Sequence, residues 1–301
     1  MANIAVKITT IKREAREKLS EGRRVTDMRE VEGKTAFISG GASGIGRGMA
    51  RAFANAGMKV MIGDIEQAPM QALVSELRQA GADADCVRVD VTDRDAVMAA
   101  ADATQARFGK VHVVCNNAGV LVDGRSEKVD MDNWNWVVDV NLWGVVYGFQ
   151  AFIPRILAHG EGGHVVNTAS MAGMVNFRGS GPYNATKFAV VALSETLMEE
   201  HKKDNLGVSV LCPGAVNTKI AESGRNRQGR YGGTDDSVNA PMAALLPDAI
   251  DPDIVGRQVL EAIRDDQPYI FTDPGLRRHI AERFRRIGLG FDWAESCEAL
   301  K

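Results

Sequence analysis

Short apolar runs alternate with longer amphipathic stretches along most of the chain, and this alternation constrains the fold more than any other feature. The runs are rich in Val and Ile, as in TAFIS, VHVVC and VSVLC. Short, nearly continuous apolar runs are typical of strands that are buried on both faces of a parallel sheet. The stretches between them have helical periodicity, and strands that alternate with helices build right-handed βαβ units. The sequence therefore predicts a three-layered, doubly wound α/β fold around a parallel seven-stranded sheet.

The predicted elements account for one domain, 33–273, which includes a Gly- and Ser-rich loop at 217–251. The predicted strands are Thr35–Ser39, Lys59–Gly63, Cys86–Val89, Val111–Cys115, His164–Thr168, Val208–Cys212 and Tyr269–Thr272. The predicted helices are Ile45–Ala56, Pro69–Ala80, Arg94–Phe108, Trp134–His159, Tyr183–Lys203 and Asp253–Asp265. Thr92 is expected to cap the third of them. Residues 1–32 are expected to form an N-terminal arm, and 274–301 a basic helix with a tail.

Composition excludes several classes of protein. The formal net charge of -3 argues against binding to nucleic acid, which depends on neutralising phosphates. The four cysteines are widely spaced, so no zinc pattern is present and no metal is predicted. Cys86, Cys115 and Cys212 lie within or beside apolar runs, which indicates reduced thiols and a cytoplasmic location. No apolar run approaches the ~18 residues that a membrane helix needs, so no membrane span is expected.

A glycine-rich turn follows the first predicted strand and precedes the first helix. Gly40, Gly44 and Gly46 have the spacing G-x-x-x-G-x-G. A pyrophosphate can approach such a turn closely because no Cβ is in the way, and the helix N-terminus supplies N–H donors. Asp64 ends the second strand, where a carboxylate accepts hydrogen bonds from the adenosine ribose and repels a 2′-phosphate. This pattern favours NAD over NADP.

Further small and polar residues follow the third and fourth strands. Asp90 and Val91 are placed to contact adenine, and Asp90 is expected to accept a hydrogen bond from its exocyclic amine. Asn117, Ala118 and Gly119 come after the fourth strand, where the carboxyl ends of a doubly wound sheet form a ligand crevice.

Four residues suit acid/base chemistry on an alcohol or ketone. Tyr183 and Lys187 are one helical turn apart, so both project from the same face. A nearby ammonium favours the phenolate and makes a tyrosine a usable acid/base, so we expect Lys187 to lower the Tyr183 pKa. Ser170 follows the fifth strand and can bind a substrate oxygen. Asn141 lies inside an apolar helix and needs polar partners, such as a water relay to Lys187.

With these motifs in this order, the chain resembles the short-chain dehydrogenase/reductase family, in its compact single-domain, NAD(P)-dependent branch with a Rossmann fold. The resemblance covers about Gly33 to Thr272 and rests on the glycine turn, Asn116-Asn117-Ala118-Gly119, Asn141, Ser170, Tyr183-Asn184-Ala185-Thr186-Lys187 and Pro213-Gly214. It implies that Tyr183 is the acid/base, that Ser170 holds the substrate oxygen, and that Lys187 also binds the nicotinamide ribose. The implied cofactor contacts are Gly40, Ser43, Gly44, Ile45, Gly46, Asp64, Asp90, Val91, Asn117, Ala118, Gly119, Tyr183, Lys187, Pro213, Gly214, Val216 and Thr218.

The resemblance also implies a substrate class and an assembly, and it makes the loop at 217–251 the segment that selects the substrate. Ser170, Met171, Phe177 and Tyr183 are expected to contact substrate, and their apolar members suggest an apolar or aromatic secondary alcohol or ketone, such as a benzylic or steroid-like alcohol. A homodimer or homotetramer is implied, with Trp134–His159 and Tyr183–Lys203 at the subunit contacts. Two alternatives stay open: an NADP-dependent carbonyl reductase on the same scaffold, and a dinucleotide-binding redox sensor without activity.

Overall fold

Seven parallel strands form one sheet in the order β3-β2-β1-β4-β5-β6-β7. The structure is a computed structural model that describes residues 26, 28–237, 239–244 and 246–300. Its strands are β1 (Thr35–Ser39), β2 (Lys59–Asp64), β3 (Ala84–Arg88), β4 (Val113–Asn116), β5 (Gly163–Thr168), β6 (Leu206–Cys212) and β7 (Tyr269–Phe271). The chain order reverses between β1 and β4, so a crevice opens at the carboxyl ends of these two strands. The predicted doubly wound Rossmann fold is confirmed.

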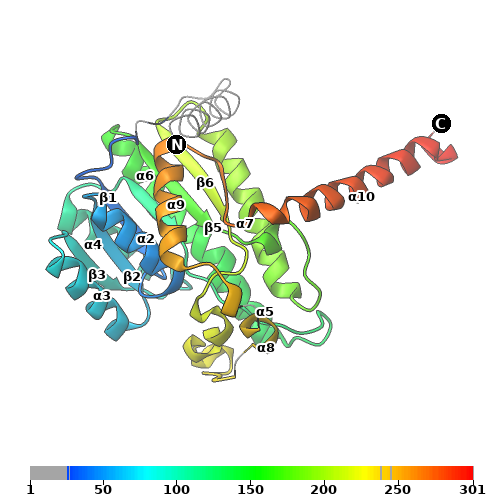
Figure 1. Cartoon of the computed structure of the whole chain (residues 1–301), viewed down its shortest axis with the longest axis horizontal. Helices are drawn as coiled ribbons and strands as arrows, with labels where there is room; N and C mark the ends of the chain where they lie inside the picture. The colour runs from blue at the N-terminus through cyan, green and yellow to red at the C-terminus, as the bar shows by residue number, and fades with distance from the viewer. Residues whose placement is uncertain (1–25, 27, 238, 245, 301) are drawn as a thin grey trace.

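Helices cover both faces of the sheet and give three layers (Figure 1). The longer helices are α2 (Gly44–Asn55), α3 (Gln67–Gln79), α4 (Arg94–Phe108), α5 (Met131–Val138), α6 (Gly144–His159), α7 (Gly181–Glu200), α9 (Pro252–Asp265) and α10 (Arg277–Ser296). One core contains side chains of α2, α3 and α9, such as Phe53, Leu73 and Val259. On the other face a second core contains side chains of α4 and α6, such as Val97 and Phe152.

Glycines let α2 and α9 approach closely behind the glycine-rich turn. A Cβ at Gly48 would lie 2.2 Å from the Pro252 carbonyl oxygen, and one at Gly256 would lie 2.1 Å from the Gly48 oxygen. Such distances exclude any larger residue unless the backbone moves. The crossing fixes the position of α2, and with it the helix N-terminus that faces the crevice.

Two local details differ from the sequence-based expectations. Asp93, and not Thr92, caps α4, because its carboxylate accepts hydrogen bonds from the N–H groups of Asp95 and Ala96. The helix predicted over Trp134–His159 begins at Met131 and contains a π-helical turn, η1 (Asp139–Trp143), between α5 and α6. The π turn contains Asn141. Single π turns inside α-helices are frequent at functional sites.

The segment between β6 and α9 consists of short helical turns. These are η3 (Lys219–Asn226), η4 (Gly229–Tyr231), α8 (Ala240–Ala243) and η5 (Leu246–Asp248). We call residues 219–231, which include η3 and η4, the lid. The lid lies beside α5 and α8, at the end of the molecule where the crevice opens (Figure 1).

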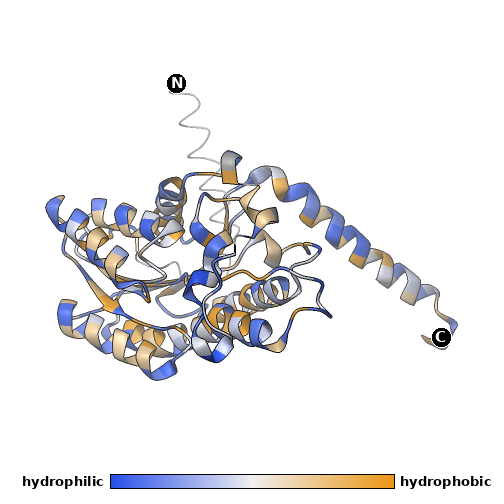
Figure 2. Ribbon diagram, turned by 90° about the horizontal axis from the view of Figure 1, so that it is seen from below, coloured by the Kyte–Doolittle hydropathy of each residue, from blue (hydrophilic) through white to orange (hydrophobic). Residues whose placement is uncertain are grey.

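The structure describes little of the predicted N-terminal arm and nearly all of the C-terminal segment. Most of the predicted N-terminal arm, residues 1–25 and 27, lies outside the described residues. Met28 and Val31 are buried in the core, so packing begins a few residues before position 33. The predicted basic helix is present as α10, which extends away from the body with hydrophobic and hydrophilic residues interspersed along it (Figure 2). The division of the chain at 33 and 273 stays a prediction.

One helical stretch in the described part of the chain, Met131–His159, is long and apolar enough to cross a membrane by length and composition alone. This differs from the expectation of no such segment. The stretch comprises α5, η1 and α6. Of its most apolar run of 18 residues, 56% is buried inside the protein. A core helix passes the same test, and Phe152 and Ile156 of α6 are indeed buried against the sheet.

Candidate active site

The glycine-rich turn is built as a cradle at the carboxyl end of β1. Gly40 has a φ of +60°, and a Cβ there would lie 2.8 Å from the Ala118 Cα. A Cβ at Gly46 would lie 2.1 Å from the Gly40 carbonyl oxygen. Ser43 precedes α2 but its side chain makes no capping hydrogen bond, and the first turn of α2 contains no acidic residue. The first N–H groups of α2 are therefore left for an anionic ligand.

Asp64 lies at the end of β2 and is largely buried. One carboxylate oxygen accepts a hydrogen bond from the Ala42 N–H at 2.9 Å, and the other accepts one from the Glu66 N–H at 3.0 Å. Burial raises the Asp64 pKa above its ordinary value, and the two backbone hydrogen bonds oppose that shift. Each oxygen keeps a further lone pair that can accept from a hydroxyl group of a ligand.

The carboxylate of Asp90, which follows β3, already has several partners. One oxygen accepts hydrogen bonds from the N–H and the hydroxyl of Thr92, at 3.0 and 2.6 Å. The other accepts one at 2.9 Å from the side-chain amide of Gln228, which belongs to the lid. A residue that comes from 138 positions along the chain therefore contacts the carboxylate that the sequence predicts at adenine.

Ser39 joins β1 to the residues that follow β4. Its hydroxyl donates to the Cys115 carbonyl oxygen and accepts from the N–H groups of Asn117 and Ala118, at 3.0 and 3.2 Å. The Asn117 amide donates to the carbonyl oxygens of Ser39 and Gly40 and accepts from the Thr168 hydroxyl. These contacts hold the walls of the crevice together where the chain order reverses.

Ser170, Tyr183 and Lys187 come together beside the ends of β5 and β6. Tyr183 and Lys187 lie one turn apart on α7, and the Lys187 Nζ is 5.5 Å from the centre of the Tyr183 ring. The same Nζ donates to the Thr168 carbonyl oxygen at 2.9 Å. Ser170 precedes the short turn η2 (Met171–Gly173), where its Oγ accepts from the Ala172 N–H at 3.0 Å.

Burial shifts the pKa of both ionisable side chains of this group. Burial raises the Tyr183 pKa above its ordinary value, and a hydrogen bond with Ser170 opposes that shift. Burial also lowers the Lys187 pKa to about 8. The Lys187 Nζ lies over the Tyr183 ring and donates to the Thr168 carbonyl oxygen, and the expected effect of Lys187 on the Tyr183 pKa stays a prediction.

Asn141 is fully buried in the π turn and holds the loop after β4. Its Oδ1 accepts from the Val120 N–H at 2.8 Å, and its Nδ2 donates to the Val120 carbonyl oxygen at 2.9 Å. The same Nδ2 reaches the Thr186 hydroxyl on α7 at 3.3 Å. A Cβ at Gly119 would lie 3.4 Å from both Asn141 Oδ1 and Lys187 Nζ, so these two groups flank Gly119.

Most of the predicted site residues line one cleft. They are Gly40, Ser43, Gly44, Ile45, Asp64, Asp90, Val91, Asn117, Ala118, Gly119, Ser170, Tyr183, Lys187, Pro213, Gly214, Val216 and Thr218. Gly46 and Asn141 support the wall from behind and do not line it. Two expected substrate contacts also differ: Met171 is buried in a core beside α7, and Phe177 is exposed outside the cleft.

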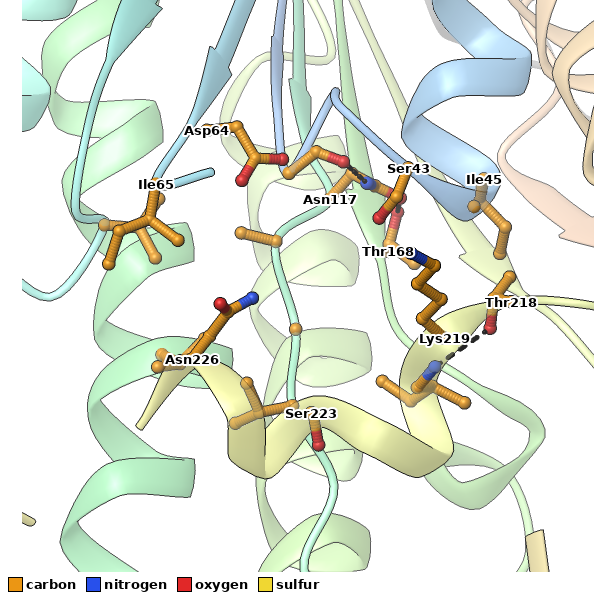
Figure 3. A pocket seen from close by; sticks show the side chains of 18 of the residues that line it. Ser43, Ile45, Asp64, Ile65, Asn117, Thr168, Thr218, Lys219, Ser223 and Asn226 are labelled. Atoms are coloured by element: carbon orange, nitrogen blue, oxygen red, sulfur yellow. Dashed lines mark hydrogen bonds between the residues drawn. The ribbon is translucent and has the colours of Figure 1, made fainter. Parts of the chain in front are cut away.

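Sequence reasoning missed several residues of the cleft wall. The apolar ones include Val120, Trp136 and Val140, and the polar ones include Glu66, Thr168, Asn226 and Gln228. Figure 3 shows Asp64 and Ile65 at one end and Thr218 and Lys219 at the other, with the Asn226 side chain of the lid pointing toward the strand ends. Glu66 could have been predicted to line the cleft because it closely follows Asp64. No sequence pattern in the lid predicts that Gln228 lines the cleft.

A separate cluster at the opposite end of the sheet brings His112, His159 and Glu161 together. His112 accepts from the Thr35 N–H at 3.1 Å and faces the Glu161 carboxylate at 3.1 Å. His159 contacts the Val111 carbonyl oxygen and the Glu161 N–H. All four ring nitrogens thus have hydrogen-bond partners, and burial lowers the His112 pKa to about 4. We interpret this cluster as a hydrogen-bonded support and not as a metal site.

The cleft fits a dinucleotide on structural grounds alone. Its glycine cradle would be filled by any Cβ, the first turn of α2 lacks a capping side chain, and Asp64 stands one strand away from that turn. Together these features supply a backbone anion site and a hydroxyl acceptor in the same cleft, which are the groups that bind a pyrophosphate and its ribose.

The family model and the known proteins that are similar to this chain and are named below are all described as dehydrogenases. A family model described as short chain dehydrogenase matches residues 34–229. A C alpha-dehydrogenase of Sphingobium sp. is 33% identical over 86% of this chain and 87% of its own length. A 1-deoxy-11-beta-hydroxypentalenate dehydrogenase of Streptomyces avermitilis is 34% identical over 88% of this chain and 96% of its own. A short-chain dehydrogenase/reductase of Burkholderia phymatum, solved in complex with NAD, superposes with a TM-score of 0.82 at 37% identity and covers 87% of this chain and 96% of its own.

Proposed function

Because the chain belongs to the short-chain dehydrogenase/reductase family, we propose that it is an NAD-dependent oxidoreductase that transfers a hydride between nicotinamide and a secondary alcohol or ketone. One observation carries the proposal. Ser170, Tyr183 and Lys187 line the same cleft as the glycine cradle and Asp64. A non-catalytic redox sensor would not require this complete set beside a dinucleotide site.

Each polar group then has a distinct role in the reaction. The nicotinamide supplies or accepts the hydride when it is bound. Tyr183 removes the hydroxyl proton during oxidation and returns it during reduction, and Ser170 holds the substrate oxygen against the phenol. Lys187 holds the nicotinamide ribose and passes protons, and Asn141 keeps the loop after β4 in place beside it. The raised Tyr183 pKa favours the protonated phenol, which is the form that gives a proton to the substrate oxygen during reduction.

The adenosine end of the cleft favours NAD over NADP. A 2′-phosphate would approach Asp64 and Glu66, and two carboxylates disfavour a phosphate there. Arg225 is the obvious cation nearby, but it is paired with Glu66 at 2.8 Å. Burial raises the Glu66 pKa, whereas hydrogen bonds from Arg225 and Asn226 outweigh this and hold it below its ordinary value, so the pair is charged at neutral pH.

The wall next to the catalytic group supports an apolar substrate. Trp136, Val140 and Val120 line the cleft and belong to one buried apolar cluster. Met242 lines the cleft as well. An apolar or aromatic secondary alcohol fits this wall, and one relative is by name a dehydrogenase of a hydroxypentalenate.

We also propose that the enzyme is a cytoplasmic homodimer or homotetramer. Trp143 on the outer face of η1 is 44% exposed and stacks on Tyr147 of α6, and Leu157 is exposed farther along α6. Exposed aromatic and apolar side chains on one helix face are typical of a subunit contact. Four free cysteines, two of them buried, fit a reducing compartment.

A cofactor-coupled screen of secondary alcohols, combined with direct binding of NADH and NADPH, tests the function. We expect turnover of aromatic or alicyclic alcohols with NAD, and tighter binding of NADH than of NADPH. Tyr183→Phe should reduce kcat by about 10²–10⁴-fold while NADH binding is kept. Tyr147→Phe is the matched control, because it makes the same change on α6 outside the cleft. Full activity of Tyr183→Phe would refute the proposed mechanism.

A further inference from the structure

The lid contacts the adenosine end of the cleft, although the resemblance assigns this segment to substrate. Arg225 reaches Glu66, which follows β2, and Gln228 reaches Asp90, which follows β3. Arg230 donates to the Thr92 hydroxyl. These pairs join residues that are 138 and 159 positions apart. The lid is therefore attached where the base and ribose of a dinucleotide would lie.

The orientation of the Gln228 amide follows from its partner. An ionised carboxylate only accepts hydrogen bonds, so the group that contacts Asp90 Oδ2 at 2.9 Å must be the NH₂. The carbonyl oxygen, Oε1, then points away from Asp90. Reversing the amide would place two acceptors against each other.

Oε1 of Gln228 is buried and has no hydrogen-bond partner among the described residues. Gln228 also lines the cleft. A buried acceptor without a donor is unfavourable by about 1–3 kcal/mol, and nearly all buried polar atoms in folded proteins have partners. A donor that enters the cleft with a ligand would remove this cost.

The nearby surface defines the kind of donor that fits. Asp90 and Val91 at the end of β3 line the same part of the cleft, where the resemblance places adenine. The Asp90 carboxylate is already occupied by Thr92 and Gln228. The exocyclic amine of adenine offers two hydrogens, and one of them can reach an acceptor that stands beside Asp90.

We propose that Gln228 recognises the amino group of adenine, with Oε1 accepting from the amine while Nε2 stays on Asp90. This proposal rests on the proposed function only in that the ligand is a dinucleotide. Through Gln228, the lid contacts the base at one end of the cofactor while it covers the cleft. Binding of the adenine amine and closure of the lid become linked, because Gln228 can satisfy both of its polar groups only when the lid is closed over the base.

Direct binding of two dinucleotides tests this. Nicotinamide hypoxanthine dinucleotide differs from NAD in that a carbonyl oxygen replaces the amino group, so it would place an acceptor against Oε1. We expect wild-type protein to bind NAD at least about tenfold more tightly in calorimetry. In Gln228→Met the two Kd values should differ by less than about threefold. Arg227→Met is the control, since Arg227 belongs to the lid and binds Gly233 and Asn133 but does not line the cleft, and it should keep the wild-type ratio.

The outcomes are distinct. A Gln228→Met protein that keeps the wild-type ratio overturns the proposal, and so does a wild-type protein that binds both dinucleotides equally well. Wild-type protein that binds neither dinucleotide refutes the proposed function itself. Gln228→Ala is the second variant should Gln228→Met fail to fold, and far-UV circular dichroism checks both.

Discussion

The two ends of the cleft are held by different kinds of contact. At the catalytic end, Asn141 and Lys187 are almost completely buried and bond to the backbone of neighbouring segments. At the adenosine end, Arg225 and Glu66 pair across the mouth with about a quarter of each side chain exposed. Buried polar networks are rigid because a broken bond leaves an unpaired group, whereas partly exposed ion pairs can be replaced by water at little cost.

This difference has a functional meaning. The groups proposed for catalysis are held in place by hydrogen bonds within the protein itself. The lid is attached by contacts that can open, which a cleft must do to admit and release a dinucleotide. Comparable regions in other enzymes, where a loop closes over a preformed site, often control the release of product.

The largest expected contrast is in stability. Asn141→Ala removes both hydrogen bonds to Val120 and leaves the N–H and the carbonyl oxygen of Val120 buried without these partners. We therefore expect the free energy of unfolding to fall by about 2–4 kcal/mol. Arg225→Met, at the other end, should lose no more than about 1 kcal/mol. Urea denaturation measures both. Equal losses would mean that the two ends are held in the same way.

A second contrast concerns pH. The Lys187 pKa is about 8 in the folded protein and 10.5 ordinarily, so between these values the unfolded chain binds a proton that the folded protein does not. The free energy of unfolding must therefore rise with pH in this window. We expect wild type to gain about 2 kcal/mol relative to Lys187→Met between pH 8 and 9.5. A constant difference between the two proteins across this range would contradict a buried, titrating Lys187.

The smallest expected effect is on salt dependence. Screening weakens the Arg225–Glu66 pair, so raising the salt concentration should speed the release of bound NADH from wild type by a few-fold. Glu66→Gln removes the charge from the pair and should show a weaker response, measured by stopped-flow fluorescence. Asp132→Asn, a similar change at an exposed acid of α5, is the control and should respond like wild type. If Glu66→Gln also responds like wild type, the pair does not hold the lid closed.

Most of the fold and much of the site could be predicted from sequence. The strand Thr35–Ser39 and the helix Arg94–Phe108 have the bounds that their patterns predicted. Tyr183 and Lys187 share a face because the helical period alone places them so. The π turn at Asn141 was missed, because a single wide turn does not disturb the apolar pattern of the helix that contains it. Met171 and Phe177 were misplaced, since proximity in sequence to Ser170 does not decide which side chains face the cleft.

The sequence by itself determined the parallel sheet, the order of the motifs and the residues proposed for catalysis. These follow from periodicity and from the rule that the carboxyl ends of parallel strands meet at one edge. Only the tertiary structure decided how the lid is attached. Arg225 and Gln228 meet Glu66 and Asp90 across 159 and 138 positions of chain. A contact of this kind depends on where two separately folded segments come to lie, and no local pattern of residues encodes it.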